Sequence, residues 1–434
     1  MSILHRIIAQ LRNREWRPAP QDLAQLHAQL AASVRGGSRA ETLALCDAII
    51  ARAPDDRAAL LAAGVNRLKT GEPERAATHF ARIEALDSGG ARTARLLTES
   101  FMDAERARRA EPYVATLDEV LVDADFWSVI EGERIYTRET QGRTVSNSPR
   151  VRGRVTPDQG RCVMTLPCQT ERIDTPCILL GSDANYAHWV IRNLLKLVLL
   201  EQAALPDGLP YLVADDLRGW HRDYLALLGI PESRLLRVPA DRVYRCRRLY
   251  VPTQLRNHPR MAQGIEWLRA KVAPLLAAPE QAHALIYASR REQVKRRLLN
   301  EAAVEDMLTA MGFRVIVPGE MGVREQIEAF SQARMVVAPH GAALANMVFA
   351  PPGATLVEIT SRAIHYMDEM RVLAASAGQQ VRSLVSEDVE PPKPVGHSRE
   401  THSDYRIDLA ALRAAVEGAL AAAPATVPNR AAPG

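Results

Sequence analysis

The feature that most constrains the fold is a change of pattern near residue 176 of this 434-residue chain. From there to residue 376, short apolar runs rich in Val, Ile and Leu alternate with longer helical segments. This alternation predicts βαβ units with parallel strands. The first series is expected to have strands at 177–181, 211–214, 235–238 and 248–251, and helices at 184–203, 217–228 and 260–275. The second is expected to have strands at 284–289, 314–317, 335–338 and 355–359, and helices at 300–311, 323–332, 342–347 and 363–376.

The region before these series is different. Residues 20–110 are rich in Ala and Leu, which favours helices. Gly37 and Gly71 lie 34 positions apart, a spacing typical of tetratricopeptide repeats. An Ala-rich helical bundle is the alternative, and either would be a docking module. The expected helices are 22–36, 39–53, 57–70 and 73–86, with a capping helix at 91–108.

These patterns predict an α/β chain with two Rossmann-like domains after an all-α helical-repeat domain. We expect a helical domain at 1–110, a first α/β domain at 111–278 and a second at 279–385. Residues 386–434 are expected to form a polar loop, one helix at 407–421 and a disordered tail. Asn300 is expected to cap its helix, and Gly312 to end it.

Composition excludes several classes of protein. The formal net charge is only +4, whereas a nucleic-acid-binding protein would show a denser stripe of basic residues. The five Cys residues are scattered, and no CxxC pair favours a zinc site or a disulfide framework. The start, MSILHRIIAQLRNREW, is charged too early for a signal peptide, and no stretch approaches the ~18 apolar residues of a membrane span. We expect a cytoplasmic protein, with a peripheral contact at the inner membrane as the alternative.

The stretch from Val336 to Asn346 predicts an anion site. A β-branched strand stops at a Pro, and His340, Gly341 and Ala342 open the next helix. The N-terminus of a helix offers unpaired amides and the positive end of a dipole, which suit phosphate. Small residues let a ligand approach the backbone, and His340 adds a donor or a proton. A plain β-α turn with a surface His is the alternative.

Two neighbouring strand ends carry further candidates. Ser289, Arg290 and Arg291 end the strand at 284–289, where an arginine can clamp phosphate oxygens. Arg290 is the preferred residue, because the basic run that follows is as easily a solvated loop. Glu358 ends a later strand, where a carboxylate can accept hydrogen bonds from ribose hydroxyls. An exposed Glu without a role is the alternative there.

The turn after the first strand of the first series contains Asp183, Asn185 and His188. His188 can accept a proton from a substrate hydroxyl. The alternative is that Asp183 or Asn185 only caps the helix while His188 and Trp189 pack on the sheet. A formal DxD at 123–125 has the oxygen ligands for a metal-diphosphate. It lies outside both α/β series, and three-residue patterns of this kind occur often by chance.

Together these residues resemble the glycosyltransferase family 61 domain over about 175–385. The resemblance rests on Asn185-Tyr186-x-His188-Trp189, then Ser289-Arg290-Arg291 with Arg297-Leu298-Leu299-Asn300-Glu301, then Pro339-His340-Gly341-Ala342-Ala343-Leu344-Ala345-Asn346 with Phe349-Ala350-Pro351-Pro352-Gly353. It implies a GT-B fold and inverting transfer from a nucleotide-sugar, usually a UDP-sugar, with no obligatory metal and no other cofactor.

The resemblance also implies roles for the two α/β domains and their residues. The first domain would bind the acceptor and the second the nucleotide-sugar. Catalysis would use His188 and Asp183, with Asn185, Tyr186 and Trp189 on the acceptor side. The donor nucleotide would be held by Ser289, Arg290, Arg291, His340, Gly341, Ala342, Asn346 and Glu358.

One position departs from the family pattern. Many relatives carry an acidic residue four positions after the motif His, where this chain has Arg192. His188 or Asp183 must then take the proton, with His188 preferred. We expect transfer to a glycan, a lipid-linked glycan or a protein, in bacterial surface polysaccharide synthesis, with a protein partner on the helical repeats. The alternative is a catalytically weak nucleotide-sugar-binding scaffold. An oxidoreductase is excluded because no GxGxxG follows an expected strand.

Overall fold

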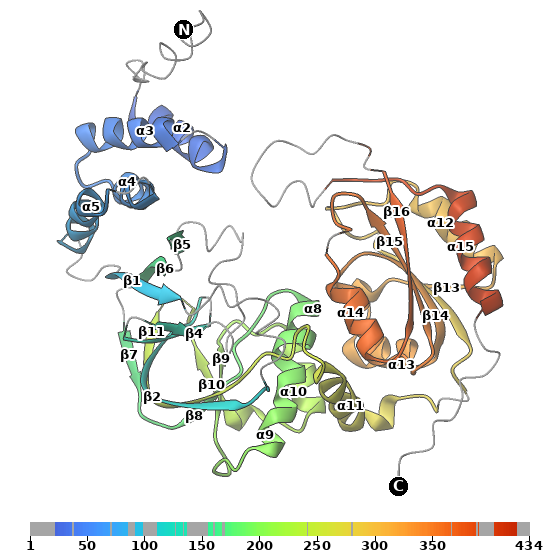
Figure 1. Ribbon diagram of the computed structural model, residues 1–434. Helices are drawn as coiled ribbons and strands as arrows, with labels where there is room; N and C mark the ends of the chain where they lie inside the picture. The colour runs from blue at the N-terminus through green and yellow to red at the C-terminus, as the bar shows by residue number, and fades with distance from the viewer. Residues whose placement is uncertain are drawn as a thin grey trace, which may run out of the picture. The chain divides into compact units, whose positions relative to one another are not determined.

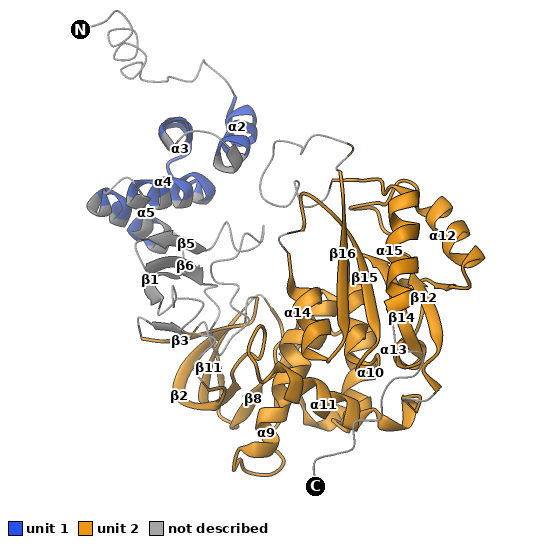
Figure 2. Cartoon of the chain, turned by 45° about the vertical axis from the view of Figure 1, so that its right-hand side comes forward, with its two compact units in different colours: residues 1–98, 145–170 blue, residues 99–144, 171–434 orange. Residues whose placement is uncertain are grey.

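The computed structural model divides the chain into two compact units, 1–98 with 145–170, and 99–144 with 171–434 (Figure 2). Each unit is described by itself. The structure describes residues 22–36, 39–69, 72–85, 92–98, 111–125, 127–132, 134–136, 155–158, 161–166, 170–240, 242–278, 281–365, 367–387, 389 and 403–422. In this part of the chain no helix combines the length and apolarity needed to cross a membrane.

The first unit contains the four N-terminal helices that the sequence predicts. They are α2 (Leu23–Gly36), α3 (Arg39–Arg52), α4 (Arg57–Lys69) and α5 (Pro73–Ala85). Leu26, Leu30, Leu45 and Ile49 form part of a small hydrophobic core between them. The tetratricopeptide interpretation of these helices stays a prediction.

The capping helix expected at 91–108 is wrong over the residues that the structure describes. Residues Arg92–Thr98 form strand β1, which pairs antiparallel with β6 (Arg161–Leu166). Strand β5 (Val155–Asp158) pairs with the other edge of β6. The backbone groups of β1 are hydrogen-bonded to a segment 64 to 74 positions further along the chain, and such distant pairing cannot be predicted from local helix propensity. Residues 99–110 lie outside the described part of the chain.

The first sheet of the second unit is mixed. Its order is β10, β9, β8, β11, β2, β3 and β4, with β7 also paired to β11. Strands β10, β9, β8 and β11 are parallel, and β11, β2, β3 and β4 are antiparallel. The bounds are β2 (Val114–Asp123), β3 (Ser128–Glu131), β4 (Arg134–Tyr136), β7 (Thr170–Ile173), β8 (Cys177–Leu179), β9 (Tyr211–Ala214), β10 (Leu235–Val238) and β11 (Val243–Pro252).

The second sheet is wholly parallel, in the order β13, β12, β14, β15, β16. The chain order is therefore 2-1-3-4-5, and the direction of winding reverses between β12 and β14. Ligands in such sheets bind beyond the carboxyl ends of the strands at this switch point. The bounds are β12 (Ala284–Ala288), β13 (Arg314–Ile316), β14 (Ala333–Pro339), β15 (Thr355–Ser361) and β16 (Gln380–Ser386).

Helices cover both faces of the second sheet, as Figure 1 shows. Alternate residues of the strands face opposite sides, as the period of a strand requires. Tyr287, Val337 and Val357 pack with α12 and α15, whereas Ile286 and Val336 pack with α13 and α14. The helices are α12 (Glu301–Ala310), α13 (Val323–Ser331), α14 (Glu369–Ser376) and α15 (Leu409–Ala422).

The helical segment after β8 is irregular. It runs from α8 (Tyr186–His188) through a π-helical turn at Trp189–Leu194 and a 3₁₀ turn at Leu195–Leu197 to α9 (Val198–Gln202). Single π turns inside helices often mark functional sites. The other helices of this series are α10 (Gly219–Leu227) and α11 (Met261–Lys271).

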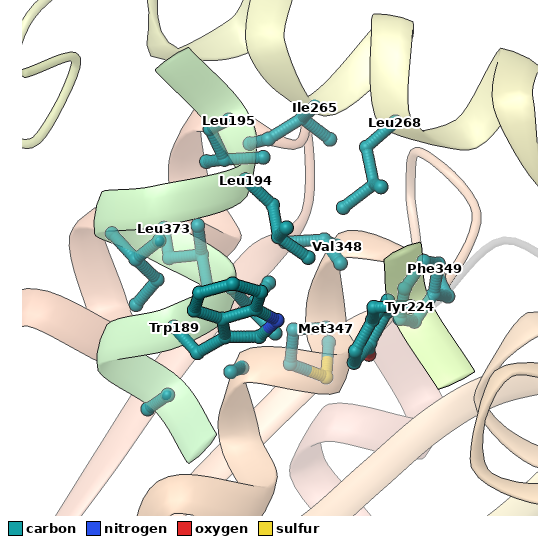
Figure 3. Packing of buried hydrophobic residues seen from close by; sticks show 14 of the residues in the cluster. Trp189, Leu194, Leu195, Tyr224, Ile265, Leu268, Met347, Val348, Phe349 and Leu373 are labelled. Carbon is teal, nitrogen blue, oxygen red and sulfur yellow. The ribbon is translucent and has the colours of Figure 1, made fainter. Parts of the chain in front are cut away.

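One hydrophobic core joins the helices of the two sheets within the second unit. Trp189, Tyr224 and Leu268 from the first series pack with Met347 and Phe349 from the second (Figure 3). The α/β prediction is thus confirmed as a mixed fold with parallel strands, consistent with Rossmann-like folds. The GT-B pairing stays a prediction.

Several local predictions need correction. Strand β16 was not predicted. Helix α14 begins at Glu369 rather than 363, and the segment at Ala342–Val348 is a 3₁₀ helix. Asn300 occupies the N-cap position of α12 as expected, but its side chain makes no capping bond and instead exchanges two hydrogen bonds with the backbone of Ile407. Gly312 has φ +88°, as expected for a residue that ends a helix.

Candidate functional site

The loop after β14 lies at the switch point, where the sequence predicts phosphate binding. The backbone N–H of His340 donates to the carbonyl of Ile359 at 2.7 Å. Its side chain is 6% exposed, and its Nδ1 lies 2.7 Å from Glu358 Oε1. Gly341 then leads into the 3₁₀ turn that begins at Ala342. The His is therefore an oriented interior group rather than a loose surface side chain.

Glu358 lies within β15 rather than at its end, and its side chain is fully buried, so the alternative of an exposed Glu without a role is wrong. Oε2 accepts a hydrogen bond from Arg371 Nη1 at 2.7 Å and another from Ser383 Oγ at 3.3 Å. Burial raises the pKa of Glu358, but His340 and Arg371 outweigh it, so the net pKa shift is downward. The Glu358 carboxylate therefore orients the His340 imidazole through the contact with Nδ1.

Arg290 extends from the end of β12 across the same loop. Its Nη1 donates to the carbonyl oxygen of His340 at 2.8 Å, and its Nη2 to that of Lys295 at 3.4 Å. A Cβ built on Gly341 would lie 1.7 Å from Arg290 Nη1. Any larger residue at this position would displace the guanidinium. The structure thus brings Arg290, His340 and Gly341 together.

Glu301, the first residue of α12, organises the turn that carries Arg290. Its Oε1 accepts hydrogen bonds from Tyr287 Oη at 2.9 Å, Ser289 Oγ at 3.1 Å and the backbone N–H of Arg290 at 2.7 Å. Ser289 is therefore buried and supports the turn.

Arg291 is directed elsewhere. Its Nη1 pairs with Glu305 Oε2 at 3.0 Å, and half of its side chain is exposed. The structure does not bring Arg291 to the loop after β14, which favours the solvated-charge interpretation for this residue.

A second group of residues lies in the turn after β8. Asp183 is buried, and its Oδ2 lies 3.2 Å from His188 Nδ1. Its Oδ1 accepts the backbone N–H of Asn185 at 3.0 Å. Asn185 Oδ1 accepts the N–H of His188 at 3.2 Å, so Asn185 caps α8. The structure thus forms an Asp–His pair with a capping Asn between the two partners.

His221, which sequence reasoning missed, holds the backbone of Asp183. Its Nδ1 accepts the N–H of Arg218 at 2.9 Å, so its Nε2 carries the proton and donates to the Asp183 carbonyl at 3.0 Å. Burial lowers the pKa of His221 to about 4, which keeps this donor neutral. No motif in the sequence marks it.

Glu369 supplies a carboxylate that the sequence did not predict. Its Oε2 lies 4.0 Å from His188 Nε2 and 3.3 Å from Arg192 Nη2, and its Oε1 lies 2.6 Å from Arg256 Nε. Burial raises the pKa of Glu369, but Arg192, Arg256 and His188 together lower it. Arg192 therefore forms an ion pair with an acidic residue of α14 that lies beside His188.

The pKa of His188 reflects these neighbours. Burial lowers it most, and the positive charge of Arg192 lowers it further. The hydrogen bond to Asp183 and the charge of Glu369 raise it in part. The balance leaves the pKa below its ordinary value, so the imidazole is neutral at pH 7 and competent to accept a proton.

A buried hydrogen-bond chain joins the two groups. Tyr186 Oη donates to Asn346 Oδ1 at 2.7 Å and lies 2.7 Å from Tyr224 Oη. Asn346 Nδ2 donates to Gln326 Oε1 at 2.7 Å. Tyr186 is two positions before His188, and Asn346 belongs to the loop that follows His340. The two expected motifs are thus in contact through the side chains of Tyr186 and Asn346.

Trp189 does not lie on an open acceptor face. Its side chain is fully buried in the core of the second unit, where Figure 3 shows it near Met347. The packing alternative is correct for this residue. Burial of this large aromatic ring removes much apolar surface from water, which stabilises the fold.

The DxD pattern forms a turn. Asp123 is fully buried at the end of β2, and its Oδ1 accepts the N–H of Asp125 at 3.3 Å. Among the residues that the structure describes, no group of three or more His, Cys, Asp or Glu side chains is placed to hold a metal ion.

Fold and site define a mixed α/β protein of the Rossmann-like class, with an oriented Asp–His pair and a loop suited to anions. Residues 186–357 match the family model described as Glycosyltransferase 61, and the chain carries a domain of that family. The protein is accordingly a glycosyltransferase, which uses a sugar donor and an acceptor. Asp183, Asn185, Glu358 and Glu369 lie outside the matched range. No curated protein matches the chain.

Proposed function

We propose that the chain is an inverting, metal-independent glycosyltransferase that moves a sugar from a UDP-linked donor to an acceptor hydroxyl. The observation that carries the proposal is the 2.7 Å hydrogen bond from Tyr186 to Asn346. It links the turn that bears a candidate base to the loop that bears a candidate phosphate site. The two halves of a transfer reaction thereby belong to one rigid network.

The donor diphosphate would lie against Arg290, His340 and the first amides after Gly341. The Arg290 guanidinium is held at the loop by the His340 carbonyl, which leaves its planar fork oriented. Such prealigned donors stabilise the charge that develops on the departing diphosphate. A guanidinium and backbone amides here take the place that a divalent cation has in other transferases, which supports metal independence.

The base would be His188. With a proton on Nδ1 donated to Asp183, the lone pair of the imidazole is on Nε2. Nε2 takes the proton of the acceptor hydroxyl as its oxygen attacks the anomeric carbon. The bond from that carbon to the phosphate oxygen breaks, and UDP leaves with its electron pair. Asp183 stabilises the imidazolium that forms, and the anomeric configuration is inverted in one displacement.

The biological setting follows from the resemblance alone. A glycan, a lipid-linked glycan or a protein would be the acceptor, in bacterial surface polysaccharide synthesis. The enzyme would be cytoplasmic, peripheral at the inner membrane, and the tetratricopeptide-like helices α2 to α5 would bind a protein partner.

The test measures hydrolysis of UDP-sugars without acceptor, in EDTA, after a thermal-shift panel of nucleotide-sugars has identified the donor. A ligand at a hundred times its dissociation constant stabilises the protein by about 2.7 kcal/mol. We expect slow hydrolysis that His188→Ala abolishes and that His283→Ala, at an exposed His of the same unit, retains. Binding without hydrolysis in the wild type would instead support the scaffold alternative, and dependence on Mn²⁺ would contradict metal independence.

A further inference from the structure

The loop between β12 and α12 contains a second arginine with an unusual environment. Arg296 has φ +54°, a region that residues other than Gly rarely adopt. Its Nε is buried and lacks a hydrogen-bond partner within the described residues, as does Nε of Arg290. Burial and, to a smaller extent, the neighbouring charge of Arg290 together lower the pKa of Arg296 to about 10. Arg290 Nη2 donates to the carbonyl of Lys295, the residue before Arg296, so the two partly buried arginines belong to one tightly folded loop.

No carboxylate pairs with either arginine in the part of the chain that the structure describes. Arg290 contacts only carbonyl oxygens, of His340 and Lys295. The neighbouring arginines are paired: Arg291 with Glu305 and Arg297 with Asp404. Two neighbouring guanidinium groups that are partly buried and form no ion pair within the described residues cost free energy, so this arrangement needs an explanation.

A third unsatisfied donor comes from the C-terminal segment. Tyr405 is 1% exposed, and its hydroxyl has no hydrogen-bond partner among the described residues. Burial raises the pKa of Tyr405, and the charges of Arg290 and Arg296 oppose this increase.

The segment that carries Tyr405 is firmly attached to the arginine loop. The backbone of Tyr405 accepts from Leu299 N at 2.8 Å and donates to the Arg297 carbonyl at 3.0 Å. Asp404 adds two hydrogen bonds to the Arg297 guanidinium and one to its backbone N–H. The backbone of Tyr405 is therefore held beside the arginine loop.

We propose that Arg296 and the hydroxyl of Tyr405 complete the diphosphate site, each donating to phosphate oxygens beside Arg290. This inference rests on the proposed function and adds to it two binding residues, one from a segment more than 100 positions beyond β12. A nucleoside diphosphate carries at least two negative charges and many acceptor oxygens, which match two cations and three unsatisfied donors. The C-terminal segment is thus part of the donor site.

The experiment is calorimetric titration of the full chain with UDP in EDTA. Arg296→Gln is expected to weaken UDP about 10- to 100-fold, as loss of a charge-assisted contact does. Tyr405→Phe, which removes only the oxygen, is expected to weaken it about 3- to 10-fold. Arg296→Lys keeps the charge and should fall between the wild type and Arg296→Gln.

Two matched controls separate binding from folding. Arg324→Gln removes an exposed arginine of α13, and Tyr244→Phe removes the hydroxyl of a buried tyrosine in the first sheet. Both should bind UDP as the wild type does. If Arg290→Gln loses UDP while Arg296→Gln and Tyr405→Phe retain it, the further inference is wrong and the proposed donor site stands. If the wild type binds no UDP, the proposed function itself fails.

Discussion

Replacing Gly341 by Ala tests the donor loop with a single added methyl group. The new Cβ would lie 1.7 Å from Arg290 Nη1 and 2.8 Å from its Cζ, whereas ordinary contacts begin at 3.4 Å. The guanidinium must therefore withdraw by about 2 Å. It would then lose its bond to the His340 carbonyl and its place beside the phosphates.

The expected loss of affinity follows from the contacts removed. A hydrogen bond to a charged group contributes about 1.5–3 kcal/mol, so UDP should bind roughly 10- to 150-fold more weakly. The free energy of unfolding should fall by less than the ~1.5–3 kcal/mol of the lost hydrogen bond. Gly341 has φ −178°, an extended conformation that Ala adopts without strain. The gain of about 0.4–1 kcal/mol from a less flexible unfolded chain offsets part of that loss.

A double-mutant cycle identifies the cause of the effect. Calorimetry should find Gly341→Ala harmful in the wild type and without further effect in Arg290→Ala, because both changes act through one guanidinium. Gly219→Ala is the control, since a Cβ there meets no atom within 4 Å. An equal loss in both backgrounds, or no loss in either, would refute the assignment of Arg290.

Three further predictions concern the Asp–His pair and its supports. His188→Ala should lower kcat by about 10²–10⁴-fold in a transfer assay, with UDP affinity unchanged by calorimetry. The acid limb of the pH profile of kcat/KM should lie below pH 6.5, because the pKa of His188 is lowered. Asp183→Asn should move this limb to still lower pH, because the Asp183 carboxylate raises the pKa of His188. Tyr186→Phe should cost about 1–3 kcal/mol in urea unfolding, since it removes the donor to buried Asn346; an unchanged midpoint would contradict the buried bridge.

Stability should also depend on the pH through His221. Its pKa is about 4 in the folded chain and near 6.5 when unfolded. The unfolded state therefore binds more protons between these values. The contribution of His221 to the free energy of unfolding is complete above pH 6.5 and is lost as the pH falls toward 4. Urea titrations of the wild type and His221→Gln at pH 7 and pH 5 measure it, and equal pH dependence in both would contradict this assignment.

Local sequence patterns predicted much of the second unit. Strands β12, β14 and β15 form within a few residues of the expected ranges, because apolar runs of this length bounded by polar turns have few other stable conformations. The convergence of Arg290 and His340 was also predictable, since parallel strands end at one edge of their sheet.

What the sequence did not reveal depends on tertiary contacts. Strand β1 exists through its pairing with β6, and its local composition favours a helix. Glu369 and Tyr405 carry no motif, and each reaches its site only because a distant segment packs there. Other predicted site residues turned out to lie away from the site. Arg291 pairs with Glu305 of α12, and Trp189 is buried in the hydrophobic core.

The most direct test of the account is a crystal structure of the chain soaked with UDP in EDTA. The account predicts the two phosphates against Arg290, Gly341 and Arg296, close to the imidazole of His340. Phosphates bound elsewhere, or a site that fills only when Mn²⁺ is added and held by carboxylates, would contradict it.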